Sequence, residues 1–177
     1  RLLREWKMPA AYFLAREAFA KADYEESLVV TENLISEGNH HPSLYRLAID
    51  SLLNLKRYDE VIGAHEHYQR HHKLEAGDYV TIATAYRYLN NFSEALKYYD
   101  YYLYDNYTDA NALCQRAQVY IELARFEEAL VDLNRAILLQ QNKAEIYALR
   151  GLCHLKTKQS KAAWEDIIRA EELDKSD

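Results

Sequence analysis

The sequence has few of the residues that interrupt helices or cross-link chains: its 177 residues include two Pro, four Gly and two Cys. Two cysteines cannot build a disulfide framework, which predicts a reducing compartment, and we therefore expect the chain in the cytoplasm. No apolar run approaches the roughly 20 residues of a membrane span, and no signal peptide precedes the first predicted helix. Hydrophobic residues (49%) and charged residues (28%) are abundant, a balance typical of a folded globular chain.

Two further absences narrow the function. The net charge is −6 and no basic patch is present, which argues against nucleic acid as a partner. The sequence also lacks a glycine-rich phosphate loop, a nucleophile elbow and a paired-cysteine motif. We therefore expect neither a cofactor nor enzymatic activity, and favour a helical protein that binds other proteins.

A period of 34 residues runs through the whole chain. Steps of 34 from each of three starting residues meet residues of similar size in every copy. The first two series consist mostly of small residues, and the third is aromatic in four of five copies. The series are Ala15, Ile49, Ala83, Ala117 and Gly151; Ser27, Val61, Ala95, Ala129 and Ala163; and Tyr24, Tyr58, Phe92, Phe126 and Ser160.

These residue types suit a hairpin of two closely packed helices. Small side chains at the crossing let two backbones approach, and an aromatic ring just before the second helix fills the turn. Apolar residues recur at helical spacing on both sides of 123–125, and this short connection leaves room only for antiparallel neighbours. The period therefore predicts a tandem array of helical hairpins.

The chain resembles the tetratricopeptide repeat (TPR) family, which has a 34-residue period and small residues at the eighth, twentieth and twenty-seventh positions of each unit. The segments 83–86, 91–96 and 125–130 look like the core strings of that family. The resemblance implies an all-α fold, a right-handed superhelical solenoid of helix-turn-helix repeats. It implies five units at 8–41, 42–75, 76–109, 110–143 and 144–177.

The two ends of the array give further expectations. Residues 1–7, with Leu2, Leu3 and Trp6, look like the tail of a preceding helix, so we expect a piece excised from a longer protein. The last unit has no additional helix to cover its final face, although solenoids normally need such a cap. We expect a cap, another repeat or a partner to follow.

In the TPR family, side chains of the first helix of each unit line a concave groove that holds a peptide or a helix of a partner. Carried over by position, the resemblance implies a groove whose centre is polar and largely uncharged, suited to hydrogen bonding with an extended backbone. Cys114 and Glu145 fall at further groove positions. The partner-binding residues are Arg16, Arg46, Asp50, Thr81, Thr84, Arg87, Tyr88, Asn111, Gln115, Gln118 and Glu122. The alternative is that these are merely solvated helix faces.

One specific TPR function can be tested on the residues. TPR domains of co-chaperones hold the C-terminal carboxylate of heat-shock chaperones with Asn at the ninth position of one unit and the sixth position of the next. No unit of this chain has Asn at either position. Arg116 and Arg150 stand one residue after the position of the clamp's arginine. The resemblance therefore does not extend to this carboxylate clamp.

Six of the 16 tyrosines fall within residues 98–107. By helical phase, Tyr99 belongs to the core, whereas Tyr98, Tyr101 and Tyr104 lie nearer the convex side. Amphipathic rings favour interfaces, so these three form an alternative binding surface. They also suit packing between adjacent second helices, with their hydroxyls in water.

Histidines cluster at residues 65–72. His67 and His71 are four residues apart and share a helical face, as two metal ligands would. A site needs a third and a fourth ligand, however, and the nearby Glu66 points elsewhere. We therefore predict no metal site, and expect His65 in the core and the other histidines solvated or partly buried.

The sequence thus favours a protein-binding adaptor or scaffold that holds a peptide or a helix of a partner in its groove. Two alternatives stay open. The array self-associates as a homo-oligomer through its uncapped end, where Leu149, Leu152 and Leu155 are apolar, or through its tyrosine-rich face. In the third interpretation it regulates an enzyme attached to it in the parent chain.

Overall fold

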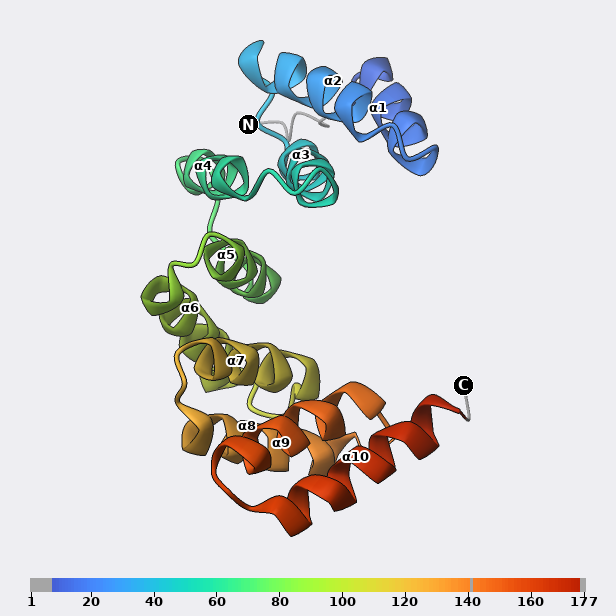
Figure 1. Cartoon of the computed structure of the whole chain (residues 1–177). Helices are drawn as coiled ribbons and strands as arrows, with labels where there is room; N and C mark the ends of the chain where they lie inside the picture. Colours follow the sequence, from blue (N-terminus) through green and yellow to red (C-terminus); the bar gives the residue numbers. More distant parts are fainter. Residues whose placement is uncertain (1–7, 141, 176–177) are drawn as a thin grey trace. The chain divides into compact units, whose positions relative to one another are not determined.

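The computed structural model describes residues 8–140 and 142–175, and the expected helix tail at 1–7 lies outside them. The described residues form ten α-helices and no strand, which confirms the all-α fold (Figure 1). The helices are α1 (Ala10–Ala20), α2 (Tyr24–Ser36), α3 (Pro42–Asn54), α4 (Tyr58–Gln69), α5 (Ala76–Tyr88), α6 (Phe92–Asp105), α7 (Ala110–Glu122), α8 (Phe126–Leu139), α9 (Ala144–Lys156) and α10 (Ser160–Asp174).

The helices follow the 34-residue period. The second helix of each pair begins at residue 24, 58, 92, 126 or 160, and each start lies 34 residues after the previous one. The aromatic series occupies the first residue of α2, α4, α6 and α8, one position later than a ring placed before the helix. Phe19 and Tyr24 meet edge to face across the first turn, with ring centroids 5.2 Å apart.

The small-residue series lies at the helix crossings, as predicted. All ten residues of the first two series are buried, because the two helices of each pair contact one another there. Gly151 shows how tight this contact is: a Cβ at this position would lie 3.3 Å from the Cβ of Asp166 and 3.4 Å from the carbonyl oxygen of Ala163. Any larger residue at position 151 would therefore push α9 away from α10.

The turn within each pair has a feature that the period did not predict. The residue two positions before each second helix has φ between 57° and 62°, in the left-handed region, and none of them is Gly. The next two amides close the turn; in the fourth pair, the Ala124 amide donates to Ile121 and the Arg125 amide to Tyr120. The five residues are Ala22, Lys56, Asn90, Ala124 and Lys158. Their strain, about 1–2 kcal/mol each, is offset by packing on both sides of the turn.

The chain divides into two compact units, one that ends at Asp78 and one that begins at Tyr79, so that the division falls within α5. In the first unit, Leu34 and Ile35 of α2 pack with Leu44 and Tyr45 of α3 and with Tyr68 of α4. In the second unit, a larger core links α5 to α9. It includes Tyr99, Leu113, Ala117, Leu133 and Ile146.

Candidate functional site

The second unit contains a cleft of about 580 Å³ formed by side chains of α5, α7 and the start of α9. These helices are the first helices of three successive pairs, which are the elements that the sequence predicts to line a groove. The cleft is lined by Arg87, Tyr88, Asn111, Cys114, Gln115, Gln118, Lys143 and Glu145. Five of the predicted binding residues therefore line one cleft: Arg87, Tyr88, Asn111, Gln115 and Gln118.

Hydrogen bonds join α7 to the start of α9 along one wall of the cleft. The Lys143 ammonium donates to Asn111 Oδ1 at 2.7 Å and lies 3.6 Å from the Glu145 carboxylate. The Gln118 amide donates to Glu145 Oε1 at 3.0 Å. Lys143 precedes α9 in the turn, so a search restricted to first-helix positions missed it. These contacts hold four polar side chains in fixed positions.

The floor of the cleft carries polar groups without a partner. Arg87 Nε is buried and has no hydrogen-bond partner among the described residues. Its guanidinium carbon lies 4.6 Å from the centroid of the Tyr88 ring, a cation–π contact that fixes the side chain. The half-buried Gln115 amide also forms no hydrogen bond within the described part of the chain. Buried polar groups favour a partner strongly, so both groups are suited to binding a ligand.

The start of α7 is held by a side-chain cap. The Asp109 carboxylate accepts hydrogen bonds from the amides of Asn111 and Ala112, at 2.9 and 3.1 Å. The Tyr102 hydroxyl donates to the same carboxylate at 2.7 Å, and this hydrogen bond raises the pKa of Tyr102 to about 12. The cap fixes Asn111 at the mouth of the cleft.

Both cysteines are free thiols. Cys114, beside the cleft, and Cys153 are buried. Burial raises the pKa of each thiol to about 11, so both stay protonated near neutral pH. Neither is suited to act as a nucleophile.

Other predicted groove residues in the second unit lie outside the lining of this cleft. The Thr84 hydroxyl lies 3.1 Å from the Tyr99 hydroxyl and is half-buried, so it contributes to packing between α5 and α6. Thr81 is half-buried on α5, and Glu122 is exposed at the last residue of α7. Thr84 is therefore a less suitable site for a test of binding than Gln115.

Three predicted groove residues belong to the first unit. Arg16 lies on α1 with its guanidinium carbon 6.0 Å from the Tyr12 ring centroid. Arg46, on α3, forms an ion pair of 2.7 Å with Glu75. Asp50, one turn further along α3, is exposed.

The tyrosine-rich segment divides between packing and exposure. Tyr99 is fully buried, as its helical phase predicts. Tyr98 is half-buried and stacks on Tyr86 of α5 with ring centroids 5.7 Å apart, which favours the packing interpretation for this residue. Tyr101 and Tyr104 are 55% and 84% exposed and remain available for an interface.

Arg116 and Arg150 have a structural role. Arg116 of α7 donates to both carboxylate oxygens of Asp132 of α8, at 2.7 and 2.8 Å. Arg150 of α9 pairs in the same way with Asp166 of α10, at 2.6 and 2.9 Å. Each arginine lies 34 residues from its counterpart, as does each aspartate. The two pairs therefore brace equivalent helix crossings.

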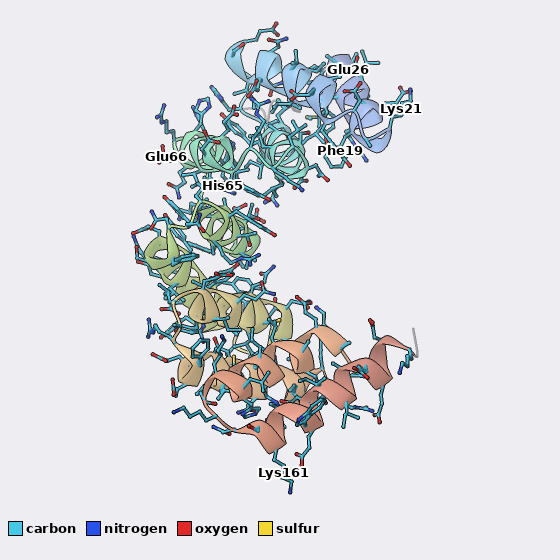
Figure 2. All side chains as sticks on the ribbon, in the orientation of Figure 1. Phe19, Lys21, Glu26, His65, Glu66 and Lys161 are labelled. Atoms are coloured by element: carbon cyan, nitrogen blue, oxygen red, sulfur yellow. The ribbon has the colours of Figure 1, made fainter. Side chains whose placement is uncertain are left out.

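The histidines of the first unit gather around the buried Tyr45. His65 is buried on α4, as predicted, and its Nδ1–H donates to the Val61 carbonyl, whereas the adjacent Glu66 is exposed (Figure 2). The sequence reasoning missed His40, which lies in the turn between α2 and α3. One ring nitrogen from each of His40, His67 and His71 lies within 4.8 Å of the other two.

The comparison with known families agrees with the helix pairs. A family model described as tetratricopeptide repeat matches residues 110–143, which contain α7 and α8. The chain belongs to the tetratricopeptide repeat family. No curated protein matches this TPR chain by sequence. Among the described helices of the TPR array, none combines the length and apolar character that crossing a membrane requires.

Solved TPR-type structures share the fold. A structure titled MamA 41-end from Desulfovibrio magneticus RS-1 superposes with a TM-score of 0.86 at 16% identity, covering 96% of this chain and 98% of that one. Another MamA crystal structure gives a TM-score of 0.84 at 12% identity, with coverage of 96% and 97%. YrrB, described as a TPR protein with an unusual peptide-binding site, gives 0.77 at 16% identity, with coverage of 92% and 84%.

Proposed function

We propose that the chain is a protein-interaction module whose second unit binds an extended segment of a partner protein in the cleft between α5, α7 and α9. The single observation that carries this proposal is the pair of polar groups without partners, Arg87 Nε and the Gln115 amide, in a cleft of about 580 Å³. A cleft with such groups gains more from binding than from remaining hydrated.

The chemistry of the cleft indicates the kind of ligand. The Gln115 amide can donate to one backbone carbonyl and accept from one backbone amide, which suits an extended peptide. Arg87 and Lys143 bring positive charge, whereas Glu145 is already engaged by Gln118 and Lys143. We therefore expect a peptide with an acidic residue close to its contact with Arg87. The peptide-binding site of YrrB, a TPR protein of similar fold, supports a role in binding rather than in catalysis.

The test is selection of binding peptides from a random displayed library, followed by fluorescence anisotropy with the full chain and its variants. We expect dissociation constants in the micromolar range, about −8 kcal/mol. Gln115→Glu places a negative charge beside the peptide and should weaken binding about tenfold or more, because one lost hydrogen bond to a charged group costs about 1.5–3 kcal/mol. Arg87→Gln should weaken most the peptides that contain an acidic residue.

Gln159→Glu is the matched control. Gln159 is exposed before α10 and its side chain makes no capping hydrogen bond, so the same change in charge should leave peptide binding unaltered. Equal affinities for the wild type, Gln115→Glu and Gln159→Glu would place the peptide elsewhere and refute the proposed cleft.

The last helix pair supports a second candidate function, self-association. Leu152 and Leu155 of α9 are 37% and 49% exposed, and Trp164 and Ile168 of α10 are 64% and 53% exposed. Apolar side chains exposed together often mark an interface between proteins. Light scattering over a range of concentrations tests this idea, because a chain that stays monomeric at high concentration does not self-associate through this surface.

A further inference from the structure

Five of the seven histidines gather where the turn between α2 and α3 meets the end of α4. His40, in the turn, stacks on His71 with ring centroids 3.7 Å apart and planes inclined by 12°. The His67 ring meets both of them edge-on, with its centroid 5.7 Å from that of His71 and 6.1 Å from that of His40. The three rings therefore face a common point, although they come from two separate segments of the chain.

The local backbone explains how His40 reaches this point. Gly38 has φ 89°, a conformation that favours glycine, and the Gly38 and Asn39 amides donate to the carbonyls of Ile35 and Leu34 at the end of α2. The Asn39 side chain then accepts a hydrogen bond from the His41 amide at 3.2 Å. This turn ends α2 sharply and directs the following residue toward α4.

His40 is held further by two hydrogen bonds. Its Nδ1 lies 2.9 Å from the hydroxyl of Tyr45, a side chain that is buried and therefore fixed. Its carbonyl oxygen accepts a hydrogen bond from Nε2–H of His72. When Nδ1–H donates to the tyrosine oxygen, Nε2 keeps its lone pair. Metal-binding histidines commonly have such an outer partner, which fixes the tautomer and the orientation of the ring.

The distances are compatible with a shared cation after small side-chain movements. Three nitrogens bound to one Zn²⁺ at about 2.0 Å in tetrahedral geometry lie about 3.3 Å from one another. The nitrogens here lie within 4.8 Å, and the rings of His40, His67 and His71 are exposed or half-buried, so rotation of their side chains closes the difference. Desolvation, reinforced by the neighbouring imidazoles, also lowers the pKa of His71, which favours the neutral form that binds metals.

We propose that His40, His67 and His71 form a binding site for a divalent transition-metal ion of the zinc class. Neutral imidazole is a ligand for Zn²⁺, Ni²⁺ and Cu²⁺, whereas Mg²⁺ and Ca²⁺ prefer oxygen ligands. A fourth position stays open to water or to a ligand, and a cavity of about 320 Å³ lined by His40, His41, Pro42 and His72 lies beside it. The bound ion ties the turn between α2 and α3 to the end of α4.

The test is isothermal titration of the untagged full chain with ZnCl₂, with Co²⁺ absorption spectra as a second readout of the ligand geometry. We expect one ion per chain. His40→Gln and His71→Gln should each weaken binding at least about tenfold, since loss of even an outer partner of a ligand typically costs 10–100-fold in affinity. His71 is exposed, so its replacement leaves the core intact.

Two further variants make the test specific. Tyr45→Phe keeps the ring and removes only the hydroxyl, and should weaken binding about tenfold through the orientation of His40. Glu66→Gln is the matched control, because this exposed residue of α4 adjoins His67 without belonging to the three-histidine set (Figure 2). Absence of saturable binding by the wild type would overturn the proposal. So would unchanged affinity in His40→Gln, since binding would then need only the pair on α4.

Discussion

Asp132 joins two helices of the second unit through a partly buried ion pair, and its removal should destabilise that unit strongly. Its carboxylate is 5% exposed and accepts two hydrogen bonds from Arg116, whose side chain is 19% exposed. Although burial lowers it, these hydrogen bonds hold the pKa of Arg116 above its ordinary value. Asp132→Ala therefore leaves a guanidinium largely out of water without its main partner.

The structure gives the size of the effect. Removing one partner of a buried ion pair costs about 3–5 kcal/mol. Arg116 keeps a contact of 2.7 Å with Asp100, which lies on α6 and is 58% exposed. We therefore expect the lower end of the range, about 3 kcal/mol, for Asp132→Ala. Asp100→Ala, by contrast, removes only the exposed part of the network and should cost less than about 1 kcal/mol.

Urea denaturation followed by circular dichroism measures both values. Glu127→Ala is the control, because Glu127 is exposed in the first turn of α8, only five residues before Asp132. This change should be nearly silent. A loss below about 1 kcal/mol for Asp132→Ala would refute the view that this pair braces the crossing of α7 and α8.

Three further predictions test the repeat frame and the core. Ala129→Glu places a carboxylate at the fully buried crossing of α7 and α8, and should lower the free energy of unfolding by several kcal/mol in the same urea titration. Ala124→Gly relieves a left-handed residue with φ 57° and should raise stability by about 1 kcal/mol; an unchanged or lower melting temperature would contradict this. Cys114 and Cys153, with pKa values raised to about 11, should react with a disulfide reagent at pH 8 only after denaturation, and rapid labelling of the native chain would show that burial does not protect them.

The fold follows from few features of the sequence. The helices meet at small residues, and steric contact at a crossing permits few alternatives at Ala83, Ala117 or Gly151, so size alone revealed the period. The strained turns were not predictable in the same way. Ala124 and Lys158 carry no chemical sign of a left-handed conformation, because packing of the two helices, and not local preference, imposes it.

The candidate site was predictable only in part. Residues of one helix, such as Gln115 and Gln118, follow from helical phase. Lys143 and His40 lie in turns between pairs, and their side chains reach a neighbouring pair by a path that spacing does not give. Arg116 was considered for a carboxylate clamp, although its partner proved to be Asp132 on the next helix. Identifying that pair requires the positions of both helices.

Site-specific photo-cross-linking tests the central claim most directly. A photoreactive amino acid at Gln115, in the cleft, is compared with the same group at Val131, which is 68% exposed on α8 and outside the cleft lining. Both proteins are irradiated in a lysate of the cells from which the chain comes, and the products are identified by mass spectrometry. The proposal predicts a cross-linked partner peptide from position 115 and none from position 131. Cross-links from position 131 alone would contradict it.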